Sequence, residues 1–121
     1  MIQVTYRETE RNRNITIEGH ANYAETGQDI VCAAVSGIAF SLMGYVENCG
    51  DRYVIHADIG RIEIEVAEPS EKTEAALEMA LIGFMQVEMA HTAHVTVSID
   101  VKCGKNKKNS GDGDYTNENL S

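Results

Sequence analysis

The segment "ITIEGHANYAETGQDIVCAAVSGIAFSLMGYVENCG", residues 15–50, contains the change of apolar period that decides the fold. It opens with a short strand, "ITIE", after which the chain reaches His20. From Ile30 onward the apolar residues recur every three or four positions, as they do on one face of an amphipathic helix; they are Val31, Ala34, Val35, Ile38, Leu42, Tyr45 and Val46. Gly50 is a typical C-cap for that helix. The irregular segment before the helix therefore separates a histidine from Cys32.

Alternating apolar and polar residues predict four further strands around this segment. "IQVTYR" (residues 2–7) forms the first strand, and "ETERNRN" (8–14) forms a polar turn after it. "RYVIHAD" (52–58) and "RIEIEVA" (61–67) form a hairpin, and "HVTVSIDV" (94–101) closes the domain.

A second helix begins after Pro69, with Ser70 as its N-cap and Glu71 in its first turn. The predicted class is α/β (α+β): a two-layer sandwich of a mainly antiparallel five-stranded sheet and two helices, in the order ββαββαβ. Residues 1–103 form a single domain. Residues 104–121 are nearly free of apolar side chains, and we expect a disordered tail.

The composition limits the possible partners. The 121-residue chain has a formal net charge of −9, which argues against nucleic-acid binding and favours a basic partner. The N-terminus "MIQVTYRETE" does not resemble a signal peptide, and no apolar run approaches the roughly 20 residues of a membrane helix. We therefore expect a cytoplasmic protein that does not enter a membrane, with reduced cysteines.

The strand that ends at His20 and the helix that begins near Asp29 should meet at one edge of the sandwich. Asp29 is a candidate N-cap, which would place Cys32 in the first helical turn. Free N–H groups and the helix dipole favour a thiolate there, and the same N–H groups can stabilise an oxyanion. Nucleophile, base and oxyanion donors can thus come from one strand end and one helix start. The alternative is that Cys32 is a small buried apolar residue.

The remaining cysteines and histidines are weaker candidates for a catalytic or metal-binding role. Cys49 and Cys103 have no evident base nearby and are interpreted as structural. His56 is expected to face solvent. His91 and His94 are separated by the predicted helix end, and no acidic or thiol ligand has matching spacing, so we predict no metal site and no cofactor.

One stripe of the second helix changes from acidic to apolar along its length. Its residues are Glu71, Glu74, Glu78, Ile82, Met85 and Met89. Either the apolar end packs under a loop, or it forms a homodimer contact.

The irregular segment and the helix start resemble the signature of the ribosomal-processing cysteine protease family, Prp. That signature is approximately G-H-A-x-Y-A, a short spacer, and G-x-D-I-V-C-A-A-V-S. The matching residues here are Gly19, His20, Ala21, Tyr23, Ala24, Gly27, Asp29, Ile30, Val31, Cys32, Ala33, Ala34, Val35 and Ser36. The order of strands and helices also fits the family from residue 1 to about residue 101.

The resemblance implies a cysteine endopeptidase with Cys32 as nucleophile and His20 as base, and a loop of Gly19, Ala21, Tyr23 and Gly27 that orders around substrate. It implies a homodimer whose substrate is the N-terminal extension of the twenty-seventh large-subunit ribosomal protein, a basic protein. Related phage members would act on structural proteins instead.

Several roles stay open at the level of sequence. Asp29 either caps the helix or orients the His20 ring. Ser36 lies one turn beyond Cys32, where it either bonds to the helix backbone or places a donor near the thiolate. Tyr23 either covers substrate or packs. Other possible functions are a ribosome-associated module that binds a peptide without cutting it, and a redox-responsive thiol.

Overall fold

The structure is a computed structural model that describes residues 1–19 and 28–101. In chain order its elements are β1 (Ile2–Glu8), β2 (Asn12–Glu18), α1 (Gln28–Asn48), β3 (Arg52–Asp58), β4 (Arg61–Ala67), α2 (Glu71–Ala90) and β5 (Val95–Val101). The order ββαββαβ is confirmed. The predicted tail, residues 104–121, lies outside the described residues, as does Cys103.

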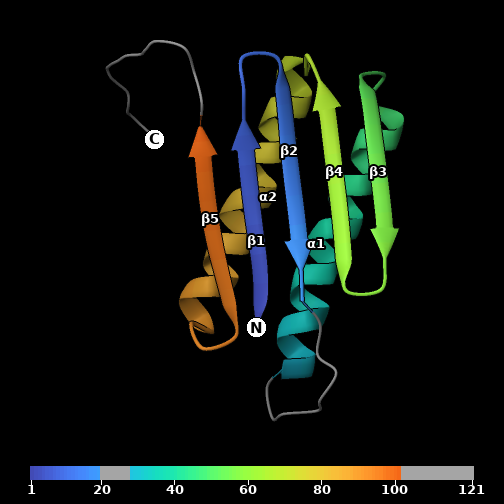
Figure 1. The fold of residues 1–121 in the computed structure, drawn as a ribbon. Coiled ribbons are helices and arrows are strands. Elements are labelled where there is room, and N and C mark those ends of the chain that lie inside the picture. The colour runs from blue at the N-terminus through green and yellow to red at the C-terminus, as the bar shows by residue number, and fades with distance from the viewer. Residues whose placement is uncertain (20–27, 102–121) are drawn as a thin grey trace.

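The five strands form one sheet in the order β3-β4-β2-β1-β5, and both helices cover the same face of it (Figure 1). Three neighbouring pairs are antiparallel, whereas β1 and β5 are parallel. A parallel pair needs a long crossover, and here the chain between β1 and β5 includes both helices. The prediction of a two-layer sandwich with a mainly antiparallel sheet is therefore confirmed.

The core lies between the helices and the sheet face that they cover. Its largest fully buried side chain is Phe84 of α2. Along α1 the buried residues are Val31, Val35, Ala39, Leu42 and Val46. The prediction for Ala34 is wrong, because this residue is exposed and Ala39 occupies the inner stripe instead. The predicted spacing of three and four residues was right. Alanines occur on both the buried and the exposed face of this helix, so the sequence does not show where the buried face ends.

The second half of β5 does not reach the core. Val95 is 1% exposed, whereas Ile99 and Val101 are 50% and 51% exposed. Figure 1 shows α2 crossing the sheet obliquely, from the end of β4 to the start of β5, so the far end of β5 is left uncovered.

By length and composition alone, Ile30–Asn48 of α1 could cross a membrane. No stretch of this kind was predicted from the sequence, because small residues separate the larger apolar ones in α1. Glu47 is the single charged residue in that stretch. Core helices of globular domains meet the same criterion, and the inner face of α1 packs on the sheet.

Strand β2 begins at Asn12, three residues earlier than the predicted "ITIE". Asn14 lies on the face of the sheet opposite the helices and donates hydrogen bonds to Glu63 (2.9 Å) and Glu65 (3.1 Å) of β4. The start of the strand is polar because it pairs with charged neighbours, and its pattern therefore resembled a turn.

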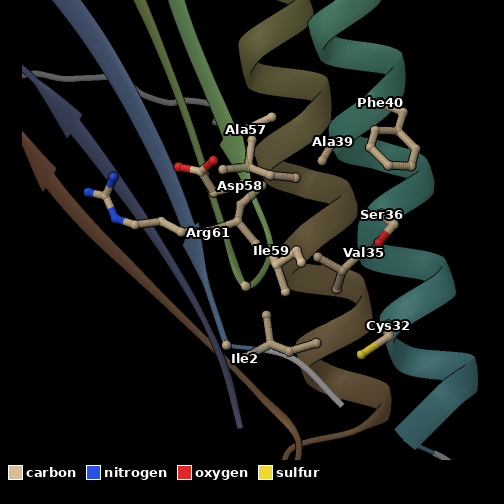
Figure 2. A pocket seen from close by; sticks show the side chains of 14 residues that line it. Ile2, Cys32, Val35, Ser36, Ala39, Phe40, Ala57, Asp58, Ile59 and Arg61 are labelled. Atoms are coloured by element: carbon tan, nitrogen blue, oxygen red, sulfur yellow. The ribbon is translucent and has the colours of Figure 1, made fainter. Parts of the chain in front are cut away.

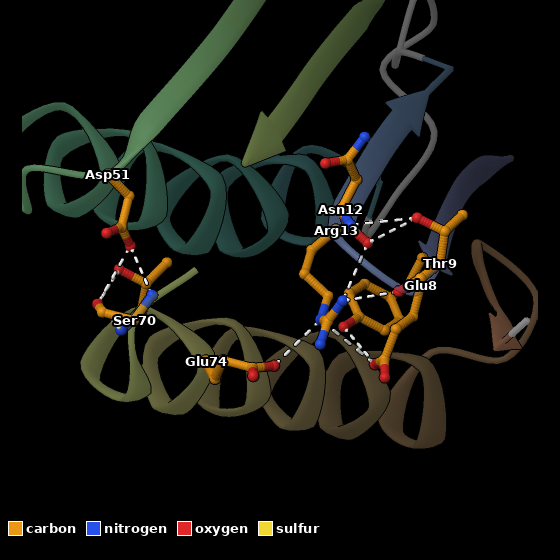
Figure 3. A network of polar contacts seen from close by, with 9 residues as sticks. Glu8, Thr9, Asn12, Arg13, Asp51, Ser70 and Glu74 are labelled. Atoms are coloured by element: carbon orange, nitrogen blue, oxygen red, sulfur yellow. Dashed lines mark hydrogen bonds and ion pairs between the residues drawn. The ribbon is translucent and has the colours of Figure 1, made fainter. Parts of the chain in front are cut away.

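The next residue, Arg13, joins the sheet to α2. Its Nε donates to Glu74 (3.0 Å) and lies 3.6 Å from Glu8, and the Tyr6 hydroxyl donates to Glu8 (2.9 Å) (Figure 3). Tyr6 is largely buried, and that burial raises the pKa of its hydroxyl well above the ordinary value. This network ties β1 and β2 to the first turns of α2.

Helix α2 starts as predicted, with Ser70 as its N-cap. The Ser70 hydroxyl accepts a hydrogen bond from the Thr73 N–H (3.4 Å), and the Ser70 N–H and O–H both donate to Asp51 (2.9 and 3.1 Å; Figure 3). Hydrogen bonds from Thr73 and Ser70 hold the pKa of the Asp51 carboxyl below its ordinary value. The cap thereby also fixes the loop after α1.

The substitution Ser70→Ala is expected to lower the free energy of unfolding by about 1 kcal/mol, because it leaves an N–H of the first turn without its acceptor. Urea titration measures this change. The matched control is Ser41→Ala on α1, where the hydroxyl only donates back to the Gly37 carbonyl and alanine is the better helix former. Equal losses in both variants would contradict the capping role.

Candidate active site

A cavity of about 730 Å³ lies between the first half of α1 and the turn that joins β3 to β4 (Figure 2). Its apolar lining comes from the sheet and from α1: Ile2, Ile17, Val35, Ala39, Phe40, Ala57, Ile59 and Ile62. Cys32 and Ser36 add the polar atoms of the helix side. A cavity of this size can hold more than one side chain of a peptide.

Cys32 presents its thiol to this cavity. The side chain is half-buried, and its Sγ is turned from α1 toward Ile2 (Figure 2). Helix α1 begins at Gln28, so Cys32 is its fifth residue, and the predicted position in the first turn is wrong. The thiol instead lies at the start of the second turn, directly after the four N–H groups that have no partner within the helix.

Gly19, the last described residue before the irregular segment, lines the same cavity. Its φ of +104° lies in the region that favours glycine, and a Cβ at this position would overlap the Met1 carbonyl oxygen. Its N–H donates to the Gly60 carbonyl in the β3–β4 turn (3.0 Å). The expectation that the strand end and the helix start share one edge of the sandwich is therefore confirmed for Gly19 and Cys32.

His20, the predicted base, directly follows Gly19 in the chain but lies outside the described residues. The loop residues Ala21, Tyr23 and Gly27 also lie outside them.

Asp29 lies within α1 as its second residue, so the predicted N-cap is wrong. The helix starts at Gln28, two residues before the Ile30 start that an N-cap at Asp29 would give. A carboxylate near the start of a helix still faces the positive end of the dipole, which favours it without a cap.

Ser36 follows Cys32 by one turn, lines the cavity and is half-buried. Among the described residues, no hydrogen bond from its hydroxyl is found, whereas Ser41 does bond back to the carbonyl four residues earlier. This difference favours the second of the two predicted roles, a donor directed toward the cavity.

The two charged side chains beside the cavity, Asp58 and Arg61, are turned away from α1 (Figure 2). Arg61 donates to Glu18 (3.1 Å) and Glu63 (3.2 Å). Hydrogen bonds from Asn14 and from Arg61 lower the pKa of Glu63. Within the described part of the chain, the space beside Cys32 is therefore lined by apolar rather than charged groups.

The other candidate groups lie elsewhere. Cys49 is half-buried just after α1, and its thiol donates a hydrogen bond to the Val46 carbonyl oxygen (3.3 Å). His56 is exposed on β3, as predicted, and His91 ends α2 before His94. Within residues 1–19 and 28–101, no three His, Cys, Asp or Glu side chains are grouped as a metal ion would require.

Comparison with known proteins identifies the family. Residues 1–96 match the family model described as cysteine protease Prp. The chain belongs to the Prp family. The Prp ribosomal processing cysteine protease of Mycoplasma pneumoniae is 32% identical over 93 residues, covering 76% of this chain and 90% of that protein. The Prp protein of Bacillus subtilis is 44% identical over 48 residues, covering 38% of this chain and 43% of that protein. The enzyme class is accordingly cysteine-type peptidase, a hydrolase.

Solved structures share the fold. The Streptococcus mutans protein SMU.848 has 25% identity and a TM-score of 0.68, covering 84% of this chain and 96% of that one. The Prp of Staphylococcus aureus, solved with a covalently linked product peptide, has 22% identity and a TM-score of 0.71, covering 83% of this chain and all of that one. The two-layer sandwich is thus a Prp fold.

Sequence reasoning did not select the β3–β4 turn as part of the site. Gly60 between two alternating strands is a signal for a tight turn there. Only the strand order, with β4 beside β2, brings that turn to the edge where β2 ends.

Proposed function

We propose that this chain removes the N-terminal extension of the twenty-seventh large-subunit ribosomal protein, in the cytoplasm, with Cys32 as nucleophile and His20 as general base. The observation that carries the proposal is the position of the Cys32 thiol in a cavity that Gly19, the residue before His20, also lines. The names of the curated relatives, ribosomal processing cysteine proteases, support the substrate class.

In the proposed reaction, His20 accepts the thiol proton and the Cys32 sulfur attacks the scissile carbonyl carbon. The carbonyl electron pair moves to oxygen and then returns as the C–N bond breaks, and His20 gives its proton to the leaving amine. A water molecule, deprotonated by His20, then attacks the thioester carbonyl carbon; the C–S bond breaks, and His20 returns its proton to the sulfur to restore the thiol. The first N–H groups of α1 and the Ser36 hydroxyl are the nearest candidates for donors to the oxyanion.

A peptide that copies the extension and its junction tests the proposal. Incubation with the protein is expected to give two fragments cut at one bond, which mass spectrometry identifies, and a peptide of the same composition in scrambled order should stay intact. An acidic enzyme suits this basic substrate, so cleavage should slow as salt is added. Tight binding of the peptide without fragments would instead establish a non-catalytic binding module.

Asp29 is proposed to favour the start of α1 rather than to orient His20. The substitution Asp29→Asn keeps the size of the side chain and removes its charge. It is expected to change kcat by less than about twofold while lowering the free energy of unfolding by roughly 0.3–1 kcal/mol, through the lost dipole interaction. A large fall in kcat with an unchanged melting curve would assign Asp29 to the catalytic group.

A homodimer is proposed from the apolar end of α2. Ile82 and Met89 of the predicted stripe are 48% and 71% exposed, so no described loop covers them. The substitution Met89→Glu is expected to shift sedimentation from dimer to monomer. The control Val54→Glu alters a similarly exposed apolar residue on β3, at the edge of the sheet away from α2's end, and should not. A monomeric wild-type protein would refute the dimer.

A further inference from the structure

Ile59, at the tip of the β3–β4 turn, is an apolar residue that the fold does not use. Its side chain is 99% exposed, the highest value among the large apolar residues described. The turn itself depends on Gly60, whose φ is +81°. On β4, Ile64 lies in the core and Ile62 packs against it, whereas Tyr53 and Val54 on β3 are 42% and 53% exposed. Ile59 therefore contributes nothing to the core, and its side chain is available for another role.

Its position relative to Cys32 suggests one. Ile59 and Cys32 lie on opposite sides of the same cavity, the first on the turn and the second on α1 (Figure 2). Along α1 the cavity continues through Ser36 to Phe40, which is 59% exposed. Eight helical residues span about 12 Å, the length of three or four residues of extended peptide.

The chemistry of the walls defines what can fill this space. Asp58 and Arg61, which flank the tip, direct their charges away from α1 (Figure 2), and Arg61 is paired with Glu18 and Glu63. Among residues 1–19 and 28–101, the side chains that face Cys32 across the cavity belong to the apolar lining named above. A peptide held at the thiol would therefore place an apolar side chain, rather than a charged one, between the turn and α1.

We propose that Ile59 is a specificity-determining residue that covers a large apolar side chain of the substrate, within about four residues of the scissile bond. The inference rests on the proposed function, because the occupant of the cavity is the peptide that Cys32 cleaves. Ile59 is also tied to the strand end before His20, since the Gly60 carbonyl accepts the Gly19 N–H (3.0 Å). Nothing in this role requires Ile59 to stabilise the fold.

The test uses the extension peptide and copies in which each apolar residue near the junction is replaced in turn by alanine. With wild-type protein, one such replacement is expected to lower kcat/KM by about tenfold or more, the usual range for one apolar group in a pocket. In Ile59→Ala, kcat/KM for the parent peptide should fall about tenfold, mainly through a higher KM. For the alanine copy, kcat/KM should change by less than about twofold. The control Ile99→Ala, a 50% exposed residue on β5, should leave both peptides unchanged.

Fluorescence anisotropy measures binding of the same peptides to the Cys32→Ala protein. This measurement tests the role of Ile59 separately from the proposed cleavage function. A preference for the parent peptide that disappears in Cys32→Ala/Ile59→Ala supports the role of Ile59, even if the wild-type protein cuts no peptide and the proposed function fails. Equal discrimination with and without Ile59, in cleavage and in binding, overturns the inference.

Discussion

Replacing Cys32 with alanine is expected to lower kcat/KM for the extension peptide by about 10⁴-fold or more, because the proposed acyl-enzyme forms on its sulfur. The fold should persist, since the side chain is half-buried and alanine suits the second turn of a helix. Cleavage is followed by mass spectrometry, and folding by circular dichroism.

The chain offers a matched control for that variant. Cys49 is also a free, half-buried cysteine of the α1 region, but it lies beyond the helix end and does not line the cavity. Cys49→Ala should cleave at the wild-type rate. Normal cleavage by Cys32→Ala, or loss of cleavage in Cys49→Ala alone, would show that the nucleophile has been assigned to the wrong sulfur.

Much of the fold could be predicted from local patterns. The alternation around Ile64 and Val66 and the cap at Ser70 depend on neighbouring residues only, and both are confirmed. Strand β2 was predicted too short, because the polarity of Asn12 and Asn14 reflects partners on another strand. Sequence periodicity cannot reveal a polar row whose stabilising contacts lie about 50 positions away in the chain.

The part of the candidate site that comes from neighbouring residues in the sequence could be predicted, whereas the part that depends on long-range strand pairing could not. The motif located Cys32 and the strand end at Gly19, and the structure places both at one cavity. The opposite wall, around Ile59, depends on β4 pairing with β2, a long-range choice that no local pattern specifies. The position of Cys32 within α1 was wrong because the helix starts two residues earlier than predicted, and this shift moves every later residue along its turns.

The substitution Gly19→Ala is expected to lower kcat by about 100-fold or more while changing KM little, since a displacement of about 1 Å in a catalytic group can cost that much. A methyl group at Gly19 would overlap the Met1 carbonyl, and a φ of +104° is unfavourable for alanine. The strand end must therefore shift, and the residue that follows it is His20.

The control is Gly37→Ala on α1, where an added Cβ meets no atom within 4 Å. That variant should keep its kcat and gain about 0.5–1 kcal/mol in the free energy of unfolding, because alanine replaces glycine inside a helix. Assays well below both melting temperatures separate misplacement from unfolding: a folded Gly19→Ala protein with a low kcat and a normal KM supports a positioning role. If folded Gly19→Ala cleaves as fast as Gly37→Ala, the backbone at the end of β2 does not set the position of the base, and His20 must be held from the helix side instead.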